Sequence, residues 1–505
     1  MASWDFYGRR AELAEIERLL DRQEFFFCAI SGRRRIGKTS LIQEALNRRN
    51  QPRRAIYVQI PDSDERGFIQ VFEDAVEDTF SDLEFARQNC GGFNDIADLL
   101  RAMWELNYIS ALDEFQYLHR KALEPFLSGL QSVVDEARRV PLRGGLITLG
   151  SIHTEMTAVL EDKSSPLFNR VTHRVRVGHW DFETLFEMFR AHDIMDADHR
   201  LFLWSIFEGV PKFYRDCFDG GALVPDADHR TSTLRRMFFE GASPLKDEAE
   251  NWFLRELRGK FDSVLKLIAR QGPCSHGRLK EEYERTGSAG AGQLSAYLAT
   301  LIERYEMVEK TSPIFAAAKD RKARYRISDN FLNAWLSAIE RAVHLARIRP
   351  IDEAINRANE SLKDHEGRTF EKMIRLLTEE CSRKGVGSFS ATELVKGYWN
   401  KSDGSDIEID LVAIDEDTRT IRFGSCKRSA TKHTSAELYK YAGHVERFLT
   451  SREGRRFVDW KIERALYSPS FDSDQRRALT AAGHVCIDLN DFDAWLRQAP
   501  KFAPS

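Results

Sequence analysis

Short apolar runs alternate with longer amphipathic stretches in the first third of the chain. Runs that suit buried strands occupy residues 25–30, 108–112 and 145–149, and apolar residues recur at helical spacing from Leu41 onward. Buried strands separated by such helices are typical of a parallel sheet with helices on its faces. The pattern therefore predicts an α/β domain built on a parallel sheet.

The pattern changes beyond Trp252 to short helices followed by a hairpin. Three helices are predicted over 261–269, 279–285 and 293–304, and two strands over 308–310 and 324–328. Three helices followed by two strands are typical of a winged helix-turn-helix. Such a domain can place its third helix in a DNA groove or can serve as a protein contact, and the sequence leaves both open.

A separate α/β unit is predicted over residues 365–498. Pro350 discourages a helix from continuing, so we expect a linker to open at residues 347–350. We expect a helix to begin at Gly367. The other predicted elements are strands over 405–414, 420–426, 464–468 and 484–487 and a helix over 435–449.

The apolar run at 25–30 leads into a glycine-rich loop, Gly32-x-x-x-x-Gly37-Lys38-Thr39, and then into the first predicted helix. This order of strand, loop and helix is typical of a nucleotide P-loop. Glycines let backbone N–H groups close on phosphate oxygens, and the helix N-terminus favours negative charge. The lysine reaches the terminal phosphates and the threonine holds Mg²⁺. We therefore predict ATP and Mg²⁺ as ligands.

An acidic strand end follows at Asp113 and Glu114. We expect Asp113 to assist Mg²⁺ and Glu114 to orient the attacking water. An Asp-Glu pair also occurs where a strand merely leaves the core, but its place after a P-loop favours catalysis. Ser151 and His153 are candidate sensors of the γ-phosphate, and Arg170 is a candidate arginine finger within the chain or towards a neighbouring subunit. Purely structural roles stay open for His153 and Arg170.

Several motifs resemble those of the prokaryotic archaeal-type ATPases, which are AAA+ and STAND-like P-loop proteins. They lie at 6–13, which matches the box FxGRxxEL, and at 113–118, 150–151, 165–167 and 209–214. The resemblance implies that the first box helps to hold the adenine and that the segment with Pro211 belongs to a helical lid that contacts nucleotide. The residues expected to bind nucleotide are Gly8, Arg9, Gly32, Arg33, Arg34, Arg35, Ile36, Gly37, Lys38, Thr39, Ser40, Ser151 and Pro211.

The order of elements in the last unit resembles the restriction-endonuclease-like fold of the PD-(D/E)XK superfamily. The resemblance implies that Asp410 binds a metal ion, Lys427 stabilises charge at phosphate and Glu371 is an accessory acid. One position departs from the family pattern, because Ser425 stands where a metal-binding Glu belongs. A hydroxyl is a weaker, neutral ligand, so nuclease activity is in doubt.

Two interpretations of this last unit stay open. In the first, an active metal nuclease uses a substitute carboxylate from Glu437 on the following helix or from Glu408, which shares the strand face of Asp410. In the second, the fold is degenerate and binds DNA or protein without cutting.

The net charge of −4 at pH 7 hides an asymmetry along the chain. Residues 251–349 contain 18 Lys or Arg and 11 Asp or Glu, so one segment is basic within an acidic protein. This asymmetry points to nucleic acid as a partner. The predicted wing carries the cations expected near phosphates, which are Lys319, Arg321, Lys322, Arg324 and Arg326.

The cysteines and the hydropathy pattern bear on the compartment. Seven cysteines include no CxxC pair, which argues against a zinc knuckle or a disulfide framework and favours a reducing compartment. No stretch has the roughly 18 uncharged apolar residues of a membrane helix. We expect a cytoplasmic protein without a membrane partner.

With these resemblances, the predicted fold is α/β and multidomain. Its parts are a P-loop ATPase core at 1–180 with a parallel sheet, a helical lid at 181–248, a winged helix-turn-helix at 249–348, and a linker with a restriction-endonuclease-like α/β domain at 349–505.

Three hypotheses for function share ATP binding. The first is an ATP-regulated DNA nuclease, for example in genome defence. The second is a nucleotide-dependent switch that binds DNA or protein without cutting. The third is a regulator whose ATP state controls transcription or assembly. The resemblance also implies a homo-oligomer joined through nucleotide interfaces.

Overall fold

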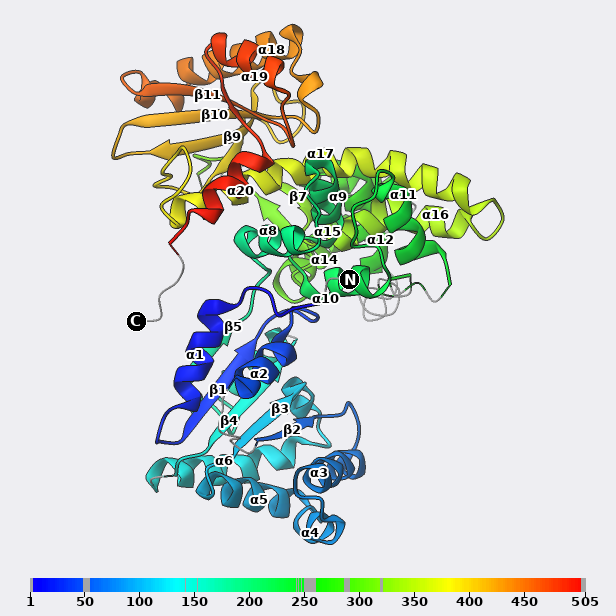
Figure 1. Cartoon of the computed structure of the whole chain (residues 1–505), viewed down its shortest axis with the longest axis vertical. Helices are drawn as coiled ribbons and strands as arrows, with labels where there is room; N and C mark the ends of the chain where they lie inside the picture. Colours follow the sequence, from blue (N-terminus) through cyan, green and yellow to red (C-terminus); the bar gives the residue numbers. More distant parts are fainter. Residues whose placement is uncertain are drawn as a thin grey trace. The chain divides into compact units, whose positions relative to one another are not determined.

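The computed structural model describes two compact units (Figure 1). The described residues are 3–48, 55–140, 142–151, 153–241, 243, 245–246, 248, 260–285, 291–317 and 321–500. The N-terminal unit comprises Phe6–Trp180 with Val210–Lys212, and the C-terminal unit comprises Asp181–Gly209 with Phe213–Lys501. Among the helices of this described part, none combines the length and apolar character needed to cross a membrane.

The N-terminal unit is built on a parallel five-stranded sheet in the order β2-β3-β4-β1-β5. Its strands are β1 (Phe26–Ser31), β2 (Ala55–Gln59), β3 (Ile109–Asp113), β4 (Gly145–Gly150) and β5 (His173–Arg176). The three strands predicted from apolar runs are confirmed as β1, β3 and β4. Neither edge strand was predicted from the sequence: β5 lacks a continuous apolar run, whereas β2 carries a short one at 55–58 that was not assigned.

Alternate residues of β1 face opposite helical layers of this unit. Phe26, Cys28 and Ile30 pack with α1 (Arg10–Leu20) and α2 (Lys38–Asn47), whereas Phe27 and Ala29 pack in the other core. That second layer consists of α3 (Glu65–Phe80), α5 (Phe93–Glu105) and α6 (Glu124–Arg139). Other elements are α4 (Leu83–Asn89), η1 (Phe115–His119) and α7 (His153–Leu160). Both faces of the sheet are therefore buried, as expected for parallel strands.

The C-terminal unit begins with helices. They are α8 (Phe182–Ala191), α9 (Ala197–Phe207), α10 (Pro211–Asp219), whose first residues belong to the N-terminal unit, α11 (His229–Leu234) and η2 (Arg235–Phe239). The predicted helices and hairpin then follow as α12 (Lys260–Gln271), α13 (His276–Arg285), α14 (Ala291–Glu303), β6 (Val308–Thr311) and β7 (Arg324–Ile327). Strands β6 and β7 pair antiparallel, as the alternation predicts. Three short helices continue the chain, α15 (Asn330–Ala334), η4 (Trp335–Ile339) and α16 (Glu340–Leu345).

A mixed five-stranded sheet in the order β12-β11-β10-β9-β8 closes the chain. Its strands are β8 (Lys396–Trp399), β9 (Glu408–Asp415), β10 (Thr420–Cys426), β11 (Lys461–Tyr467) and β12 (Val485–Ile487). The helices beside it are α18 (Ser435–Thr450), α19 (Ser473–Ala481) and α20 (Leu489–Arg497), with short turns η5 (Ala430–Lys432) and η6 (Gly454–Phe457). Strand β10 pairs antiparallel with β9 and parallel with β11. The predicted strands and the helix at 435–449 are confirmed.

One long helix, α17 (Ile351–Arg383), replaces the expected linker and the helix start at Gly367. The helix begins directly after Pro350, so the prediction that no helix continues through this proline holds. The predicted start at Gly367 is wrong, because the helix runs through Gly367 without a break. A Cβ at Gly367 would meet nothing within 4 Å. The apolar stripe that includes Ile355, Leu362 and Phe370 is buried along the helix, and this burial outweighs the roughly 1 kcal/mol that a helical glycine costs.

The hairpin connection between β6 and β7 packs on the final sheet. Ile314 joins the hydrophobic core of that sheet, and its backbone N donates to Gly397 O at 2.9 Å. The Phe315 and Phe448 rings stack with centroids 6.0 Å apart. The wing predicted for DNA contact therefore makes protein contacts within its own unit.

Candidate functional site

The loop after β1 has the backbone that phosphate binding requires. Gly37 adopts φ +87°, and α2 begins at the next residue without a side-chain cap for its N-terminus. A Cβ at Gly32 would lie 2.4 Å from Val177 O, so only glycine fits there. Arg35 also takes a left-handed backbone, and Ile36 is buried in the core. The uncapped helix end leaves its N–H groups for an anionic ligand.

Lys38 is buried at the start of α2, with its ammonium group at the predicted phosphate site. Its Nζ donates to Gly32 O at 3.0 Å, Arg33 O at 3.1 Å and Ser151 Oγ at 2.8 Å. Burial lowers the pKa of Lys38 to about 8, although the charges of Glu114 and Asp113 act in the opposite direction. Ser151, predicted as a phosphate sensor, therefore lies beside Lys38. The side chain of His153 lies outside the described part.

Asp113 at the end of β3 gathers two hydroxyl groups. Thr39 Oγ1 and Tyr57 Oη each donate to Asp113 Oδ2 at 2.7 Å. The contact between Thr39 and Asp113 fits a Mg²⁺ site, because hydroxyl and carboxylate oxygens are the ligands that Mg²⁺ prefers. Sequence reasoning missed Tyr57. Its position on β2 beside β3 could have been found only from the alternation of Ile56 and Val58, which are buried.

Glu114 lies just beyond the strand end and is held by a neighbour. Its backbone adopts φ 51°, and its N donates to Asp113 Oδ1 at 2.7 Å. The side-chain amide of Gln116 donates to Glu114 Oε2, and Gln116 Oε1 accepts from Ser151 N at 3.3 Å. The strand-end residues of β3 and β4 are therefore connected through Gln116, another residue that sequence reasoning missed.

The first sequence motif and the lid motif both reach the loop. Arg9 Nη2 donates to Ile36 O at 3.0 Å and to Gly178 O at 2.6 Å, and Gly8 has φ 65°. A Cβ on Gly37 would lie 3.8 Å from Pro211 Cγ. Arg9 and Pro211 are thus beside the P-loop. Arg34 and Ser40 are exposed.

Arg170 is engaged elsewhere in the N-terminal unit. Its Nε and Nη2 donate to the two carboxylate oxygens of Asp135 on α6, each at 2.8 Å. Its Nη1 donates to Phe168 O at 3.0 Å. A role as an arginine finger requires this bidentate pair to open, and it stays a prediction, as does the homo-oligomer.

Residues 6–212 match the model of an ATPase domain found predominantly in Archaea. The protein is an ATPase. The matched residues include the loop from Gly32 to Thr39, the Asp113 strand end and Pro211. Residues 335–438 match a family of archaeal and bacterial proteins of unknown function.

Three other proteins are similar to this ATPase over about two thirds of its length or more. An uncharacterized protein of Methanocaldococcus jannaschii is 25% identical over 426 residues, which are 84% of this chain and 87% of that protein. The Walker-type ATPase of Pyrococcus abyssi is 19% identical, with a TM-score of 0.48, over 66% of this chain and 96% of that one. The Aeropyrum pernix ORC2 protein, in ADPNP–ADP complexes, is 15% identical, with a TM-score of 0.45, over 71% of this chain and 95% of that one.

A second site in the C-terminal unit of the ATPase is a cavity of about 710 Å³. Helix α17, strands β9 and β10, helix α18 and the β6–β7 hairpin all contribute residues to it. The predicted residues Glu371, Asp410 and Lys427 line this cavity together, with Ser425 beside them. The fold therefore brings together three residues that lie far apart in the sequence.

Two carboxyl groups of the cavity, those of Glu371 and Asp410, have raised pKa values. Burial raises the pKa of both Glu371 and Asp410, and the charge of Asp410 raises that of Glu371 further. Asp410 Oδ2 accepts from Cys426 N at 2.8 Å. Lys427 Nζ donates to Glu437 Oε2 at 3.0 Å, so Glu437 lies next to the lysine. Neutralisation of the carboxyl pair by a proton or a cation is thus favoured.

The cavity fits a divalent cation only in part. Within the described ranges, no group of three or more His, Cys, Asp or Glu side chains is arranged to hold a metal ion. Ser425, on β10, supplies a hydroxyl where a third carboxylate is expected. Glu408, the other proposed substitute, pairs with Arg324, whose Nη1 lies 2.6 Å from Glu408 Oε1.

The wing cations are largely engaged by carboxylates. Arg321 is exposed, and Lys319 lies outside the described residues. The pairs are Arg324 with Glu408, Arg326 with Glu309 and Lys322 with Glu453. Contact of these wing residues with phosphates stays a prediction, and it would compete with these ion pairs.

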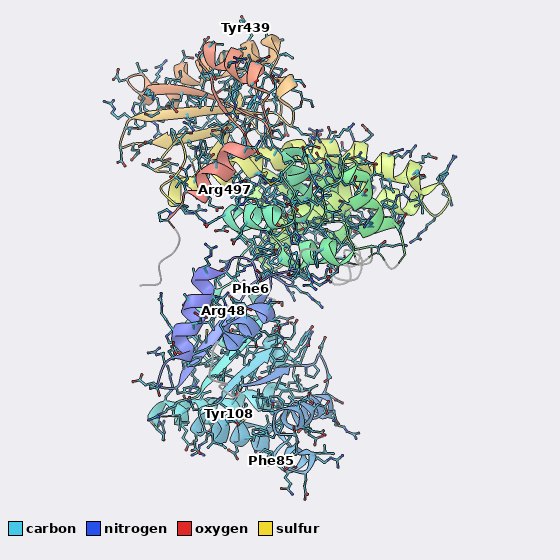
Figure 2. The ribbon with its side chains drawn as sticks, viewed as in Figure 1. Phe6, Arg48, Phe85, Tyr108, Tyr439 and Arg497 are labelled. Atoms are coloured by element: carbon cyan, nitrogen blue, oxygen red, sulfur yellow. The ribbon has the colours of Figure 1, made fainter. Side chains whose placement is uncertain are left out.

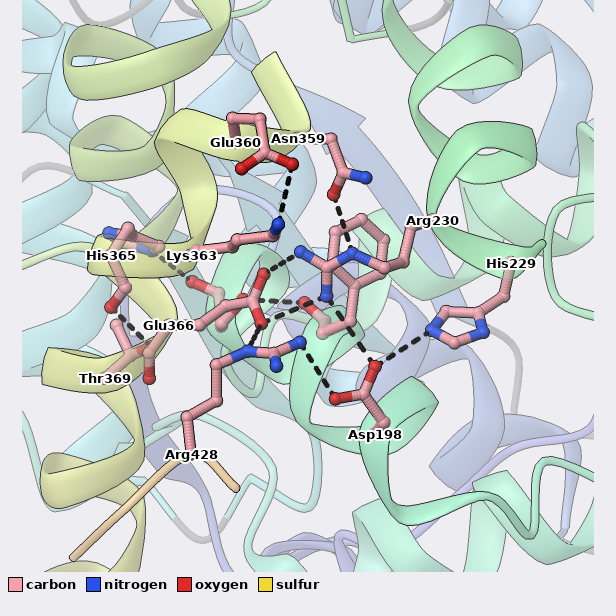
Figure 3. Close-up of polar contacts among 12 residues, drawn as sticks. Asp198, His229, Arg230, Asn359, Glu360, Lys363, His365, Glu366, Thr369 and Arg428 are labelled. Atoms are coloured by element: carbon pink, nitrogen blue, oxygen red, sulfur yellow. Dashed lines mark hydrogen bonds and ion pairs between the residues drawn. The ribbon is translucent and has the colours of Figure 1, made fainter. Parts of the chain in front are cut away.

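A buried ion network lies just beyond the end of β10 at Cys426. Arg230 of α11 and Arg428 both pair with Glu366 of α17, and Arg428 Nη2 donates to Asp198 Oδ1 at 2.9 Å (Figure 3). Glu366 is fully buried and forms ion pairs with both guanidinium groups. Because Arg428 directly follows Lys427, the network joins the helices α9 and α11 to the end of β10.

Proposed function

We propose that the ATPase binds ATP with Mg²⁺ and that its nucleotide state controls the binding of DNA by the C-terminal unit. Thr39 and Asp113 would hold Mg²⁺, and Lys38 would contact the terminal phosphates. Mg²⁺ would supply charge neutralisation at those phosphates. The 2.7 Å contact from Thr39 Oγ1 to Asp113 Oδ2 supports this assignment. Glu114 would orient the attacking water.

The composition of the cavity carries the DNA-binding part of the proposal. Nine Lys or Arg and four Asp or Glu line it, in a protein whose net charge is −4. A concave surface with this excess of cations attracts phosphodiesters. The cations are Lys310, Arg324, Arg326, Arg368, Lys372, Arg375, Lys396, Lys427 and Lys440.

Arg368 is the cation we propose as the principal phosphate contact. It lies on the same face of α17 as Glu371 and Arg375, at helical spacings of three and seven residues. Among the described residues, the guanidinium group of Arg368 makes no hydrogen bond or ion pair, whereas Arg375 Nη1 donates to Asp410 O at 3.1 Å. Arg368 would therefore bind phosphate without giving up a hydrogen bond or an ion pair, although the charges of Asp364 and Glu371 act on it.

Fluorescence anisotropy with labelled DNA tests the proposal. We expect binding in the presence of a non-hydrolysable ATP analogue to differ from binding with ADP, and to weaken as salt rises. Arg368→Ala should weaken binding and reduce the salt dependence by about one phosphate contact. Arg383→Ala is the matched control, because Arg383 lies on the same helix, is exposed and does not line the cavity.

A second control lies on α18. Tyr439 is 84% exposed and points away from the unit (Figure 2), whereas Glu437, Lys440 and Tyr441 line the cavity. Tyr439→Ala should leave DNA binding unchanged. Equal weakening by the Arg368, Arg383 and Tyr439 variants would point to a diffuse charged surface and contradict binding in the cavity.

Metal-dependent DNA cleavage is the second candidate function. The convergence of Glu371, Asp410 and Lys427 favours it, and Glu437, which pairs with Lys427, is one candidate for the missing carboxylate. Plasmid and linear DNA incubated with Mg²⁺ or Mn²⁺, with and without ATP, test this candidate. Cleavage that is lost in both Asp410→Ala and Lys427→Ala would establish it. Retention of DNA without cleavage would favour the binding function.

A further inference from the structure

Gln116 is almost completely buried, and both ends of its side-chain amide are used. The exposed fraction is 1%. Its Nε2 donates to the Glu114 carboxylate, which can only accept, and its Oε1 accepts from Ser151 N, which can only donate. The chemistry of the two partners therefore determines the orientation of the amide. A buried amide satisfied at both ends holds its partners in a defined geometry.

The partners of Gln116 lead directly to the phosphate site. Ser151 Oγ accepts from Lys38 Nζ at 2.8 Å, so a continuous chain of contacts runs from Lys38 through Ser151 and Gln116 to Glu114. At the other end, the Glu114 backbone is held by Asp113. These contacts thus connect Lys38, the lysine expected at the terminal phosphates, to Glu114, the carboxylate expected to orient water.

The neighbouring backbone makes room for this arrangement. Glu114 takes a left-handed backbone at φ 51°, which a residue of this kind adopts rarely and at a cost. A Cβ on Gly150 would lie 3.0 Å from Gln116 Oε1 and 2.1 Å from Met156 Sδ. The glycine at the end of β4 therefore leaves space for the amide of Gln116.

We propose that Gln116 is a positioning residue for ATP hydrolysis. It orients the Glu114 carboxylate through one hydrogen bond and fixes the position of the Ser151 backbone through the other. Gln116 itself contacts no phosphate in this assignment and acts through Glu114. Because the carboxylate has several rotamers, removal of the amide leaves Glu114 free to turn away from the attacking water. The inference rests on the role of Glu114 in the proposed function.

Steady-state hydrolysis and nucleotide binding test the proposal in four variants. Gln116→Leu removes the amide at similar volume, and Gln116→Glu keeps the acceptor for Ser151 N while it repels Glu114. We expect both to lower kcat by about tenfold or more, with the Kd for ATP changed by less than about threefold. Asparagine is too short to reach both partners, so the kcat of Gln116→Asn should lie between that of these two variants and that of the wild type. Glu114→Gln should bind ATP and hydrolyse it only at a slow residual rate, which single-turnover measurements can still follow.

The double variant separates positioning from a structural role. In the Glu114→Gln background, Gln116→Leu should cause no further loss of kcat, because the two residues act as one unit. An additional loss in that background, or an unchanged kcat in all three Gln116 variants, would overturn the proposal. If Glu114→Gln alone hydrolyses ATP normally, the assignment of Glu114 fails first. Thermal unfolding of each variant identifies any that fails to fold.

Discussion

Glu208 Oε1 accepts a hydrogen bond of 2.7 Å from Lys372 Nζ, so the end of α9 is tied to the middle of α17. Lys372 Nζ also donates to Ser328 O and to Asn330 Oδ1, both at 3.1 Å. Glu208 has φ 52°, which is unusual for a residue with a side chain. Glu208 lies three residues before Pro211, and Lys372 directly follows Glu371 of the cavity. Within the C-terminal unit, the pair therefore connects the end of α9 to the helix that carries a proposed site residue.

Loss of Lys372 should destabilise the C-terminal unit. The side chains of Lys372 and Glu208 are 16% and 9% exposed, so Lys372→Ala removes the Lys372 cation from a largely buried ion pair. We expect the free energy of unfolding to fall by about 3 kcal/mol. Urea denaturation followed by tryptophan fluorescence measures it. Lys363→Ala is the control, because the Lys363–Glu360 pair is exposed and worth less than about 1 kcal/mol. Equal effects of the two changes would contradict the structural role of the buried pair.

The affinity for ATP should fall as the pH rises above about 8. Burial lowers the pKa of Lys38 to about 8 in the nucleotide-free protein, and bound phosphates raise it again because they favour the ammonium form. Full affinity is therefore present below pH 8, and binding weakens by up to about tenfold per pH unit above it, until the pKa of the complex is reached. Titration with a fluorescent ATP analogue from pH 7.5 to 9.5 measures the slope. Lys38→Arg, which stays charged, should lack it, and equal slopes would contradict the prediction.

Acid should destabilise the C-terminal unit through a buried histidine. His365 is completely buried and its Nε2 donates to Ser205 O at 2.7 Å, while burial lowers its pKa to about 4. An unfolded histidine titrates near pH 6.5. The stability is therefore complete above about pH 6.5 and is lost as the pH falls from 6.5 towards 4, by about 2 kcal/mol between pH 7 and pH 5.

The variant His365→Gln tests this acid sensitivity. Glutamine keeps an N–H donor for Ser205 O but does not titrate. Urea unfolding at pH 7 and pH 5 should show a smaller loss of stability in the variant than in the wild type. An identical loss would assign the acid sensitivity to other groups.

A third carboxylate in the cavity should strengthen cation binding. Ser425 lies in the cavity with Asp410 and Glu371, and Ser425→Glu would restore the acid that the resembled superfamily carries there. We expect Mg²⁺ or Mn²⁺ to bind roughly tenfold more tightly, because ligand charge sets the affinity of such sites. Isothermal titration calorimetry measures it, with Ser425→Gln as a control of the same size. Equal affinities of the two variants would argue that the cavity is not a cation site.

Local features of the nucleotide site were predictable from the sequence. The P-loop, the helix after it and the strand that ends at Asp113 each depend on neighbouring residues, whose spacing determines backbone conformation and burial. The prediction failed where a local pattern competed with packing. Gly367 suggested a helix boundary, but α17 continues through it because its apolar stripe is buried against the unit.

The sequence by itself determined the P-loop, the helix after it, the strand that ends at Asp113 and most of the chemical groups at the two candidate sites. Lys38, Thr39, Asp113 and Glu114 stand at strand and helix ends because the order of apolar and polar residues dictates those ends. Only the tertiary structure decided which groups meet. The contacts of Tyr57 with Asp113 and of Arg324 with Glu408 bridge 56 and 84 residues of chain. Sheet order and side-chain packing select such pairs, and no spacing along the chain encodes them.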